Sequence, residues 1–572
     1  MLIDCCSSYI YLMIILDIKN LSLSFKNNKT ANQVLFNVSY QLHENEILGV
    51  VGESGSGKSV SSLAVLGLLP KKQTIFNSGE ILFKSDNVLS YQNDDFRKLR
   101  GHKIAMIFQE PMTSLNPSLT CGKQVVEILQ EHLGLSNANA KDEVLLLFEK
   151  VKLPDPEVIY SKYPHQISGG QKQRVMIAMA IACKPDVLIA DEPTTALDVT
   201  VQKEIIALLK DIQQETGMSV IFISHDLSLI SEISDRVVVM YKGTIVEQGA
   251  VSDVFHNPQH EYTKALINSR PSVNQRLKVL PTISDYLNNT TQHEIVSVNE
   301  RVEYHKSLYS TEPLLRVENV EKSYVTKGFL FKKDIEFKAV NDVSFNLYEG
   351  ETLGLVGESG CGKSTLGNAI LQLDKATSGQ VFYKGQDITN ISKTELRTLR
   401  KEIQLIFQDP YSSLNPRLPV GKAIMEPMKV HKLYANDKER KEKTLELLKR
   451  VGLEESHFYR YPHEFSGGQR QRIGIARTIA VNPKLIICDE SVSALDISVQ
   501  AQVLNLLNEL KDNFGFSYIF ISHDLAVVKY MSDQLVVMNK GKIEEIGEAD
   551  SIYENPKTEY TKSLIDAIPK GK

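Results

Sequence analysis

An eight-residue motif that occurs twice constrains the fold of this chain more than any other feature. Each copy follows a short apolar run, at residues 47–51 and 353–356, and each fits the pattern G-x-x-x-x-G-K-[ST]. Between a buried strand and a helix, this pattern is a P-loop, whose glycines let successive backbone N–H groups point at phosphate oxygens. We expect two such loops, made of Gly52, Glu53, Ser54, Gly55, Ser56, Gly57, Lys58 and Ser59, and of Gly357, Glu358, Ser359, Gly360, Cys361, Gly362, Lys363 and Ser364.

The last two residues of each loop have defined tasks in this pattern. Lys58 and Lys363 should reach the β- and γ-phosphates of a nucleotide, and Ser59 and Ser364 should ligate Mg²⁺. The helix that follows adds its positive N-terminal end. A glycine-rich turn without a ligand is the alternative, but two matches with matching flanks are hard to obtain by chance from an average composition.

The rest of the chain is duplicated as well. Later motifs of the two halves recur 298 or 299 positions apart, which indicates a tandem duplication rather than a solenoid with periods of about 20–50 residues. Short apolar runs that alternate with helical stretches predict an α/β fold with a parallel sheet in each half. We predict a dispensable tail at residues 1–12, a first domain at 13–270, a linker of little periodicity at 271–313 and a second domain at 314–572.

Two carboxylates end an apolar strand in each half. Asp191 and Glu192 follow residues 187–190, and Asp489 and Glu490 recur 298 positions later. A carboxylate at a strand end beside a P-loop can hold Mg²⁺, the role we assign to Asp191 and Asp489. Glu192 and Glu490, one residue further on, are then placed to act as general bases on the attacking water. A polar strand end without a function is the alternative.

Three further motifs recur in both halves. A serine and two glycines open a helix and offer a second anion site, and a glutamine and a histidine each follow a strand. Any one of these alone would more often be an ordinary polar loop residue, but each recurs at the same place in both halves. These residues are Ser168, Gly169, Gly170 and Gln171 with Ser466, Gly467, Gly468 and Gln469; Gln109 with Gln408; and His225 with His523.

Charge and cysteine usage exclude some classes of protein. The net charge of −5 argues against a strongly basic nucleic-acid binder. The six cysteines form no C-x-x-C pair, which is typical of a reduced protein without a disulfide framework or structural zinc.

The longest candidate membrane segment, residues 9–16, is far shorter than the ~20 residues of a spanning helix. We interpret residues 1–12 as an extra tail, or Met13 as the functional start.

These motifs together resemble the ATP-binding-cassette (ABC) ATPases, with every cassette motif present in both halves. The resemblance implies an antiparallel β subdomain and a helical subdomain around each parallel-sheet core. It implies that Gln109 and Gln408 sense Mg²⁺, that the signature serine and glycines bind the γ-phosphate of ATP held by the opposite half, and that His225 and His523 stabilise the γ-phosphate and the attacking water. Phe25 and Tyr324 stand where an aromatic residue stacks on adenine, with a surface aromatic as the alternative.

A narrower resemblance is to the oligopeptide and dipeptide importer ATPases. The runs that begin at Gln109 and Gln408, and the Asn-Pro and Glu-Tyr-Thr-Lys motifs near residues 257–264 and 555–562, carry it. In that family two subunits are usually separate, whereas the glutathione and microcin-peptide members fuse them. Departures are Ile167 and Phe465 before the signatures and Ser491 after the second glutamate. No cysteine lies between Cys183 and Cys361, so the iron–sulfur cluster of some members is not expected.

The resemblance implies an ATPase, with ATP and Mg²⁺ as cofactors, that drives a membrane importer for peptides or a similar solute of dipeptide, oligopeptide, glutathione or nickel type. Implied partners are two transmembrane permease subunits and, indirectly, an extracytoplasmic solute-binding protein, with the chain peripheral on the cytoplasmic face of the inner membrane. The alternative is a soluble tandem cassette that acts on ribosomes. Such proteins usually carry a long charged helical linker, which residues 271–313 do not resemble.

Overall fold

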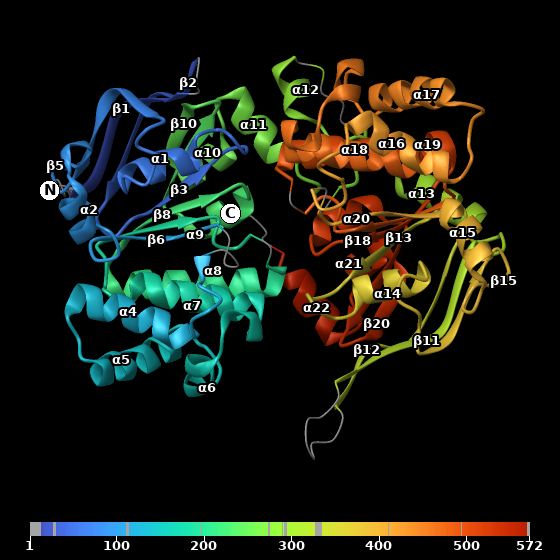
Figure 1. Cartoon of the computed structure of the whole chain (residues 1–572), viewed down its shortest axis with the longest axis horizontal. Coiled ribbons are helices and arrows are strands. Elements are labelled where there is room, and N and C mark those ends of the chain that lie inside the picture. The colour runs from blue at the N-terminus through green and yellow to red at the C-terminus, as the bar shows by residue number, and fades with distance from the viewer. Residues whose placement is uncertain are drawn as a thin grey trace, which may run out of the picture. The chain divides into compact units, whose positions relative to one another are not determined.

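The computed structural model describes residues 13–26, 30–109, 114–195, 197–272, 275–288, 290, 294–326, 335–409, 411–493 and 495–568. These residues fall into two compact units (Figure 1). The first unit holds the described residues up to 197 together with 201–267, and the second holds 198–200 together with 268–568. The tail predicted at residues 1–12 lies outside the described residues.

Two sheets form the first unit. A six-stranded sheet runs in the order β10-β9-β3-β8-β7-β6, and all neighbours are parallel except the antiparallel pair β9 and β10. A second sheet, β2-β1-β4-β5, is antiparallel. The strands are β1 (Ile14–Lys26), β2 (Ala31–His43), β3 (Ile47–Val51), β4 (Thr74–Phe83), β5 (Asp86–Asn87), β6 (Ile104–Ile107), β7 (Val187–Asp191), β8 (Ser219–Ser224), β9 (Arg236–Tyr241) and β10 (Thr244–Ala250).

Helices α4 to α7 form a group of their own beside the larger sheet (Figure 1). Ser136 begins α5 by accepting a hydrogen bond from the N–H of Asn139, and Gly134 ends α4 in the left-handed conformation that glycine tolerates. The helices of the first unit are α1 (Lys58–Val65), α2 (Asn93–Leu99), α4 (Cys121–Leu133), α5 (Asn137–Lys150), α6 (Pro156–Ser161), α7 (Gly169–Ile181), α8 (Val199–Thr216), α9 (Leu227–Ile233), α10 (Val251–His256) and α11 (Glu261–Asn268).

The second unit repeats this architecture, with a six-stranded sheet β16-β17-β18-β13-β19-β20 and an antiparallel sheet β12-β11-β14-β15. Its strands are β11 (Leu315–Thr326), β12 (Ile335–Leu347), β13 (Thr352–Val356), β14 (Ser378–Tyr383), β15 (Gln386–Asp387), β16 (Ile403–Ile406), β17 (Leu485–Asp489), β18 (Ser517–Ile521), β19 (Gln534–Asn539) and β20 (Lys542–Glu548). Its helices after residue 350 are α14 (Lys363–Ile370), α15 (Lys393–Glu402), α16 (Val420–Val430), α17 (Asp437–Arg450), α18 (Gly467–Ile479), α19 (Ile497–Phe514), α20 (Leu525–Met531), α21 (Ala549–Glu554) and α22 (Glu559–Asp566).

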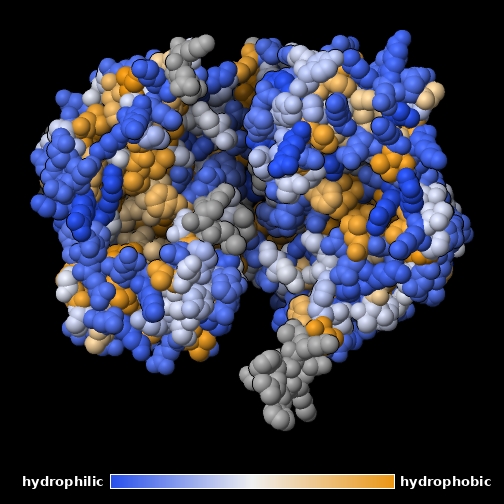
Figure 2. Space-filling view, in the orientation of Figure 1, coloured by the Kyte–Doolittle hydropathy of each residue, from blue (hydrophilic) through white to orange (hydrophobic). Residues whose placement is uncertain are grey.

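The parallel strands are the buried centre of each unit. All five residues of β3 and of β13 are buried, as are all residues of β8 and β18. This explains why they read as continuous apolar runs, since helices cover both faces of a parallel sheet. Hydrophilic residues cover most of the face of each unit in Figure 2. The α/β prediction, with an antiparallel sheet and a helical group in each half, is confirmed. Within the described residues no helix is long and apolar enough to cross a membrane.

The segment predicted as a linker contains two helices, α12 (Ile283–Leu287) and α13 (Val298–Leu308), and belongs to the second unit. Each begins with a capping box, in which Thr282 pairs with Asp285 and Ser297 pairs with Glu300. Leu280 joins the main apolar core of this unit. The domain boundaries expected from the sequence stay a prediction.

Candidate functional site

Each P-loop needs glycine for its backbone. Gly52, which follows β3, has a φ of 149°, and Gly57, just before α1, has a φ of 102°. A Cβ built on Gly52 would lie 2.1 Å from the carbonyl oxygen of Met240. The second loop is the same, because a Cβ on Gly357 would lie 2.2 Å from the carbonyl oxygen of Met538. Any side chain at these positions would displace the loop from the neighbouring strand.

The P-loop lysines are buried and held by the loop itself. The Lys58 amine donates to the carbonyl oxygens of Gly52 at 2.7 Å and Glu53 at 2.9 Å. Lys363 makes the same two bonds to Gly357 and Glu358, at the same distances. Because the loop backbone already holds each ammonium group, a small rotation of the lysine side chain would bring it to the oxygens of a phosphate bound in the loop.

A tyrosine that is far from each loop in the sequence accepts a hydrogen bond from the loop backbone. The N–H of Glu53 donates to the Tyr262 hydroxyl at 3.0 Å, and the N–H of Glu358 donates to the Tyr560 hydroxyl at 3.2 Å. Both tyrosines belong to the Glu-Tyr-Thr-Lys motifs, which sequence reasoning used only as a mark of resemblance. The structure shows what the motif does: it fixes the backbone of the phosphate-binding loop.

Each predicted metal-ligating pair is in contact. The Ser59 hydroxyl donates to Asp191 Oδ1 at 3.1 Å, and the Ser364 hydroxyl donates to Asp489 Oδ1 at 2.9 Å. Burial raises the pKa of both carboxyls, although the serine bonds oppose it. One hydroxyl and one carboxylate per site suit Mg²⁺, which keeps several waters and takes few protein ligands. The residues therefore fit the ion that the sequence predicts.

Three side chains hold the Glu192 carboxylate. Its Oε2 accepts hydrogen bonds from the Gln109 amide at 2.8 Å and the Thr195 hydroxyl at 3.0 Å, and lies 3.1 Å from His225 Nδ1. Burial works to raise the pKa of Glu192, but His225, Lys58 and Thr195 outweigh it and lower the pKa to about 2. Glu192 also has a φ of 49°, a left-handed backbone that is uncommon outside glycine. Such strain concentrates at functional sites.

The second unit repeats this cluster with differences at the histidine and at the position of Thr195. Gln408 donates to Glu490 Oε2 at 2.6 Å, His523 Nδ1 lies 3.7 Å from the same oxygen, and Glu490 has a φ of 47°. The contact with His523 lowers the pKa of Glu490. Burial works to lower the pKa of His523, but Glu490 outweighs it and raises that pKa. Ser493, the counterpart of Thr195, donates to the Glu490 carbonyl rather than to the carboxylate.

The three residues that depart from the family pattern, at the two signatures and after the second glutamate, are all buried. Ile167 and Phe465 are buried, so an apolar side chain is what these positions require. The hydroxyl of Ser491 is buried without a hydrogen-bond partner within the described residues. This places a buried hydroxyl beside the cluster around Glu490, where the first unit has proline.

The signature serines are exposed N-caps. Ser168 begins α7 and accepts a hydrogen bond from the N–H of Gln171, and Ser466 begins α18 and accepts from Gln469. In return each glutamine side chain accepts the N–H of its serine, at 3.1 Å. A capped helix start with exposed N–H groups is suited to an anion.

The two aromatic residues predicted to stack on adenine differ in their environment. Phe25 is half-buried against the core of the first unit. Tyr324 is exposed, its hydroxyl donates to Asp374 at 2.7 Å, and the Lys322 amine lies 5.2 Å from its ring centre. Contact of either ring with a nucleotide stays a prediction. Residues 110–113, part of the run that follows Gln109, lie outside the described residues.

Two family profiles match the chain. The ABC transporter profile matches residues 35–195 and 340–493, which include both P-loops and both signatures. The profile described as oligopeptide/dipeptide transporter, C-terminal region, matches residues 246–295 and 545–572.

The chain is also similar to curated relatives and to a solved structure. The glutathione import ATP-binding protein GsiA of Salmonella paratyphi A is 46% identical over 567 residues, which is 97% of this chain and 89% of that protein. GsiA of Escherichia coli K12 is 46% identical over 566 residues, with the same coverage. A solved ATP-binding cassette, dimeric and bound to ADP and Pi, is 30% identical and covers 41% of this chain and 98% of its own, with a TM-score of 0.38.

Proposed function

This chain belongs to the ABC transporter family, as a tandem ATPase of a peptide-type importer, and from that premise we propose that glutathione or a peptide of similar size is the solute whose import it drives. The relatives with 46% identity are named as glutathione import proteins, which favours glutathione. The C-terminal oligopeptide/dipeptide profile keeps short peptides as the second candidate.

The observation that carries the hydrolytic part of this proposal is the pair of matching clusters. In each unit a P-loop serine contacts the aspartate that ends a strand, and a glutamine and a histidine contact the following glutamate. Two such clusters in one chain equip both halves for hydrolysis. We propose that both sites turn over ATP.

The residues divide the work as phosphoryl transfer requires, by positioning and by charge stabilisation. Loop N–H groups and Lys58 or Lys363 bind the β- and γ-phosphates. Ser59 with Asp191, and Ser364 with Asp489, would hold Mg²⁺, which neutralises charge on the phosphate oxygens when bound. The signature serines would bind the γ-phosphate through their helix starts.

Glu192 has to be released before it can act as a base. While His225 and Gln109 hold the carboxylate, its pKa of about 2 makes it a poor proton acceptor. We propose that both side chains turn toward the γ-phosphate and the metal site when ATP binds. Loss of the histidine contact would let burial raise the pKa of Glu192, so that it accepts the proton of the attacking water.

The import function requires membrane partners, since the solute path cannot lie in an ATPase of this kind. We propose two transmembrane permease subunits as direct partners, an extracytoplasmic solute-binding protein as an indirect one, and the cytoplasmic face of the membrane as the location. The family membership and the peptide-type C-terminal profile support this assignment.

Uptake into proteoliposomes tests the solute. The chain is purified with its two permeases, reconstituted with ATP on the side of the chain, and supplied with the binding protein and labelled glutathione on the other. We expect glutathione uptake that the Lys58→Ala and Lys363→Ala variants abolish. If unlabelled dipeptides suppress this uptake and unlabelled glutathione does not, the solute is a dipeptide rather than glutathione. ATP-dependent uptake of nickel alone would contradict a peptide-type solute.

A further inference from the structure

The helix that follows His523 is held by a segment that lies between the two matches of the ABC transporter profile. We call the described residues within 270–309 the strap; it includes α12 and α13 and belongs to the second unit. Leu280 is fixed by two hydrogen bonds with the Asn505 side chain of α19, at 2.9 and 2.8 Å. The strap is therefore seated on the unit by specific polar contacts as well as by its apolar residues.

Two strap arginines bind the C-terminal end of α20. Arg276 donates to the carbonyl oxygens of Tyr530 at 2.7 Å and Ser532 at 3.2 Å. Arg301 donates to the carbonyl oxygens of Ser532 at 3.0 Å and Asp533 at 3.2 Å. The last carbonyls of a helix have no partner within the helix. Arg276 supplies partners for Tyr530 and the cap residue Ser532, and Arg301 does so for Ser532 and for Asp533 just beyond the helix. The charge of both groups also suits the negative end of a helix.

The same arginines tie this helix end to α21. Arg276 lies 3.1 Å from Asp550 of α21, and Arg301 lies 3.0 Å from Asp550 and 2.7 Å from Glu548. The arginine side chains are only 13% and 11% exposed. A buried guanidinium paired with carboxylates and carbonyls has a fixed geometry. The end of α20 is thus anchored to two neighbours.

The other end of α20 carries the catalytic histidine. The helix has seven residues, about 10 Å at 1.5 Å per residue. Asp524 caps its first turn by accepting the N–H groups of Ala526 and Val527, and His523 comes directly before. Arg270 of the strap lies 3.6 Å from Asp524. A shift of so short a helix would move His523 away from Glu490.

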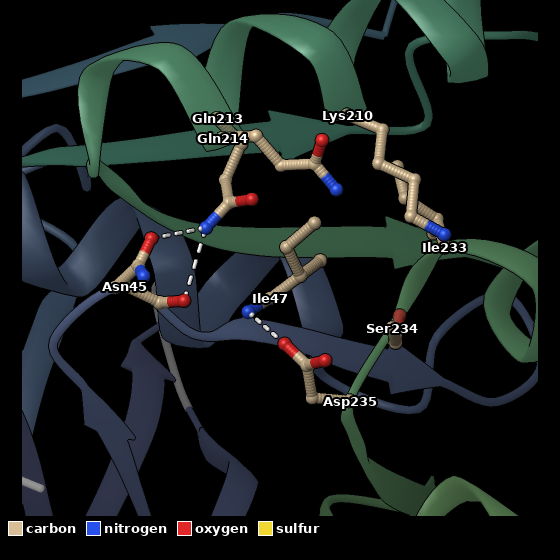
Figure 3. A pocket seen from close by; sticks show the side chains of 8 residues that line it. All are labelled: Asn45, Ile47, Lys210, Gln213, Gln214, Ile233, Ser234 and Asp235. Atoms are coloured by element: carbon tan, nitrogen blue, oxygen red, sulfur yellow. Dashed lines mark hydrogen bonds between the residues drawn. The ribbon is translucent and has the colours of Figure 1, made fainter.

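The matching helix of the first unit, α9, has a different environment. Its C-terminal carbonyl at Glu232 accepts a bond from Lys210 at 3.3 Å. The positions that match Glu548 and Asp550 hold Ala250 and Ser252. Beside this end lies a cavity of about 320 Å³, which Figure 3 shows next to Asp235. The eight residues around it are Asn45, Ile47, Lys210, Gln213, Gln214, Ile233, Ser234 and Asp235.

We propose that Arg276 and Arg301 are positioning residues for ATP hydrolysis at the second site, acting through α20 on His523. The proposal rests on the proposed role of His523 in hydrolysis. It assigns Arg276 and Arg301 to the second site, because their hydrogen bonds to backbone carbonyls lie at the C-terminal end of α20. The strap therefore has a catalytic consequence at a distance from the nucleotide.

Steady-state ATPase measurements on the full chain with its permeases test the proposal through a mutant cycle. We expect Arg276→Ala with Arg301→Ala to lower kcat about 10-fold, because small misplacements of reacting groups are costly, with the KM for ATP unchanged within about twofold. The matched control, Lys210→Ala at the end of α9, should leave kcat within about twofold of wild type.

The two histidine backgrounds separate positioning from general damage. In a His523→Ala chain the arginine substitutions should lower kcat by less than about twofold, since residues that act as a unit are not additive. In a His225→Ala chain they should keep their full factor. An equal factor in both backgrounds, or no effect in the wild-type chain, would overturn the proposal. If His523→Ala alone left kcat unchanged, the role of His523 itself would be refuted.

A conservative variant covers the case in which the alanine variants do not fold. Arg301→Lys keeps the charge but not the two-pronged geometry, so we expect a folded chain with a kcat below that of wild type. If Arg301→Lys leaves kcat equal to that of its parent chain, in the wild-type and in both histidine backgrounds, the arginine only stabilises the fold.

Discussion

Replacement of Asp533 by alanine should destabilise the second unit far more than the same change at its counterpart, Asp235, destabilises the first. Asp533 accepts the N–H of Thr352 at 2.9 Å and the Lys511 amine at 2.9 Å, and lies 3.4 Å from His305. Its side chain is 8% exposed. Asp235 accepts the N–H of Ile47 at 2.8 Å but is exposed.

The magnitudes follow from burial. Removal of one partner of a buried ion pair costs about 3–5 kcal/mol, because the remaining charge stays buried without compensation. Loss of the single hydrogen bond of Asp235 costs about 1 kcal/mol. For a unit of this size each kcal/mol lowers Tm by about 2–4 °C, so we expect a fall of about 6–20 °C for Asp533→Ala and about 2–4 °C for Asp235→Ala.

The effect of Asp533 also has a defined dependence on pH. Burial alone would raise the pKa of Asp533, but Lys511, His305 and the Thr352 N–H outweigh it and hold the pKa well below its usual range. A carboxyl whose pKa is lowered on folding stabilises the protein above its unfolded pKa of about 4. That contribution is lost as pH falls through the folded pKa, so wild type and Asp533→Ala should converge in strong acid.

Fluorescence can report each unit separately, because the chain has no tryptophan. Phe514→Trp, beside Phe516, would report the second unit, and Tyr91→Trp, beside Phe96, would report the first. Thermal unfolding at pH 7 should show the large shift only for the second reporter in the Asp533→Ala chain. Equal shifts for Asp533→Ala and Asp235→Ala, each read in its own unit, would refute the reasoning from burial.

Three further predictions concern the loops and the tail. Gly52→Ala should weaken ATP binding to the first site by more than about 10-fold, since its Cβ would meet the Met240 carbonyl. Gly55→Ala should weaken it less, because its Cβ would meet nothing within 4 Å and only its φ of 79° is unfavourable. Equal affinities in equilibrium dialysis would contradict this. Tyr262→Phe should raise the KM for ATP about fivefold through loss of about 1 kcal/mol, and an unchanged KM would show that the hydroxyl does not support the loop. Deletion of residues 1–12 should change neither ATPase activity nor membrane attachment, and loss of attachment would identify the tail as an anchor.

Local patterns were sufficient to predict which residues of the candidate nucleotide sites lie together. The strand before each P-loop, the glycines and the carboxylates at strand ends are all visible in short stretches, and parallel strands bring their ends together at one edge. The contacts of Ser59 with Asp191 and of Gln109 with Glu192 follow from that arrangement. Their spacing in sequence, 132 and 83 residues, did not hide them because the motifs mark both partners. The importer interpretation is confirmed over the ribosome-acting alternative by the family matches.

The strap could not be predicted in the same way. Arg301 binds Glu548, 247 positions away, and Arg276 binds Asp550, 274 positions away. An arginine in a polar segment carries no mark of its partner, and the sequence reads equally well as a solvated linker. The two capping boxes at Thr282 and Ser297 were the available signal, since they indicate helix starts. The left-handed backbone of Glu192 is likewise a product of tertiary packing.

Turnover in two matched variants tests the central claim, that Glu192 and Glu490 each serve a working ATP site. Glu192→Gln and Glu490→Gln keep the shape of the side chain and remove only the base. We predict that each lowers kcat in the permease-bound chain by at least about 100-fold, the range for loss of a general base, while ATP still binds with wild-type affinity. A wild-type kcat in either variant would contradict the claim for that site.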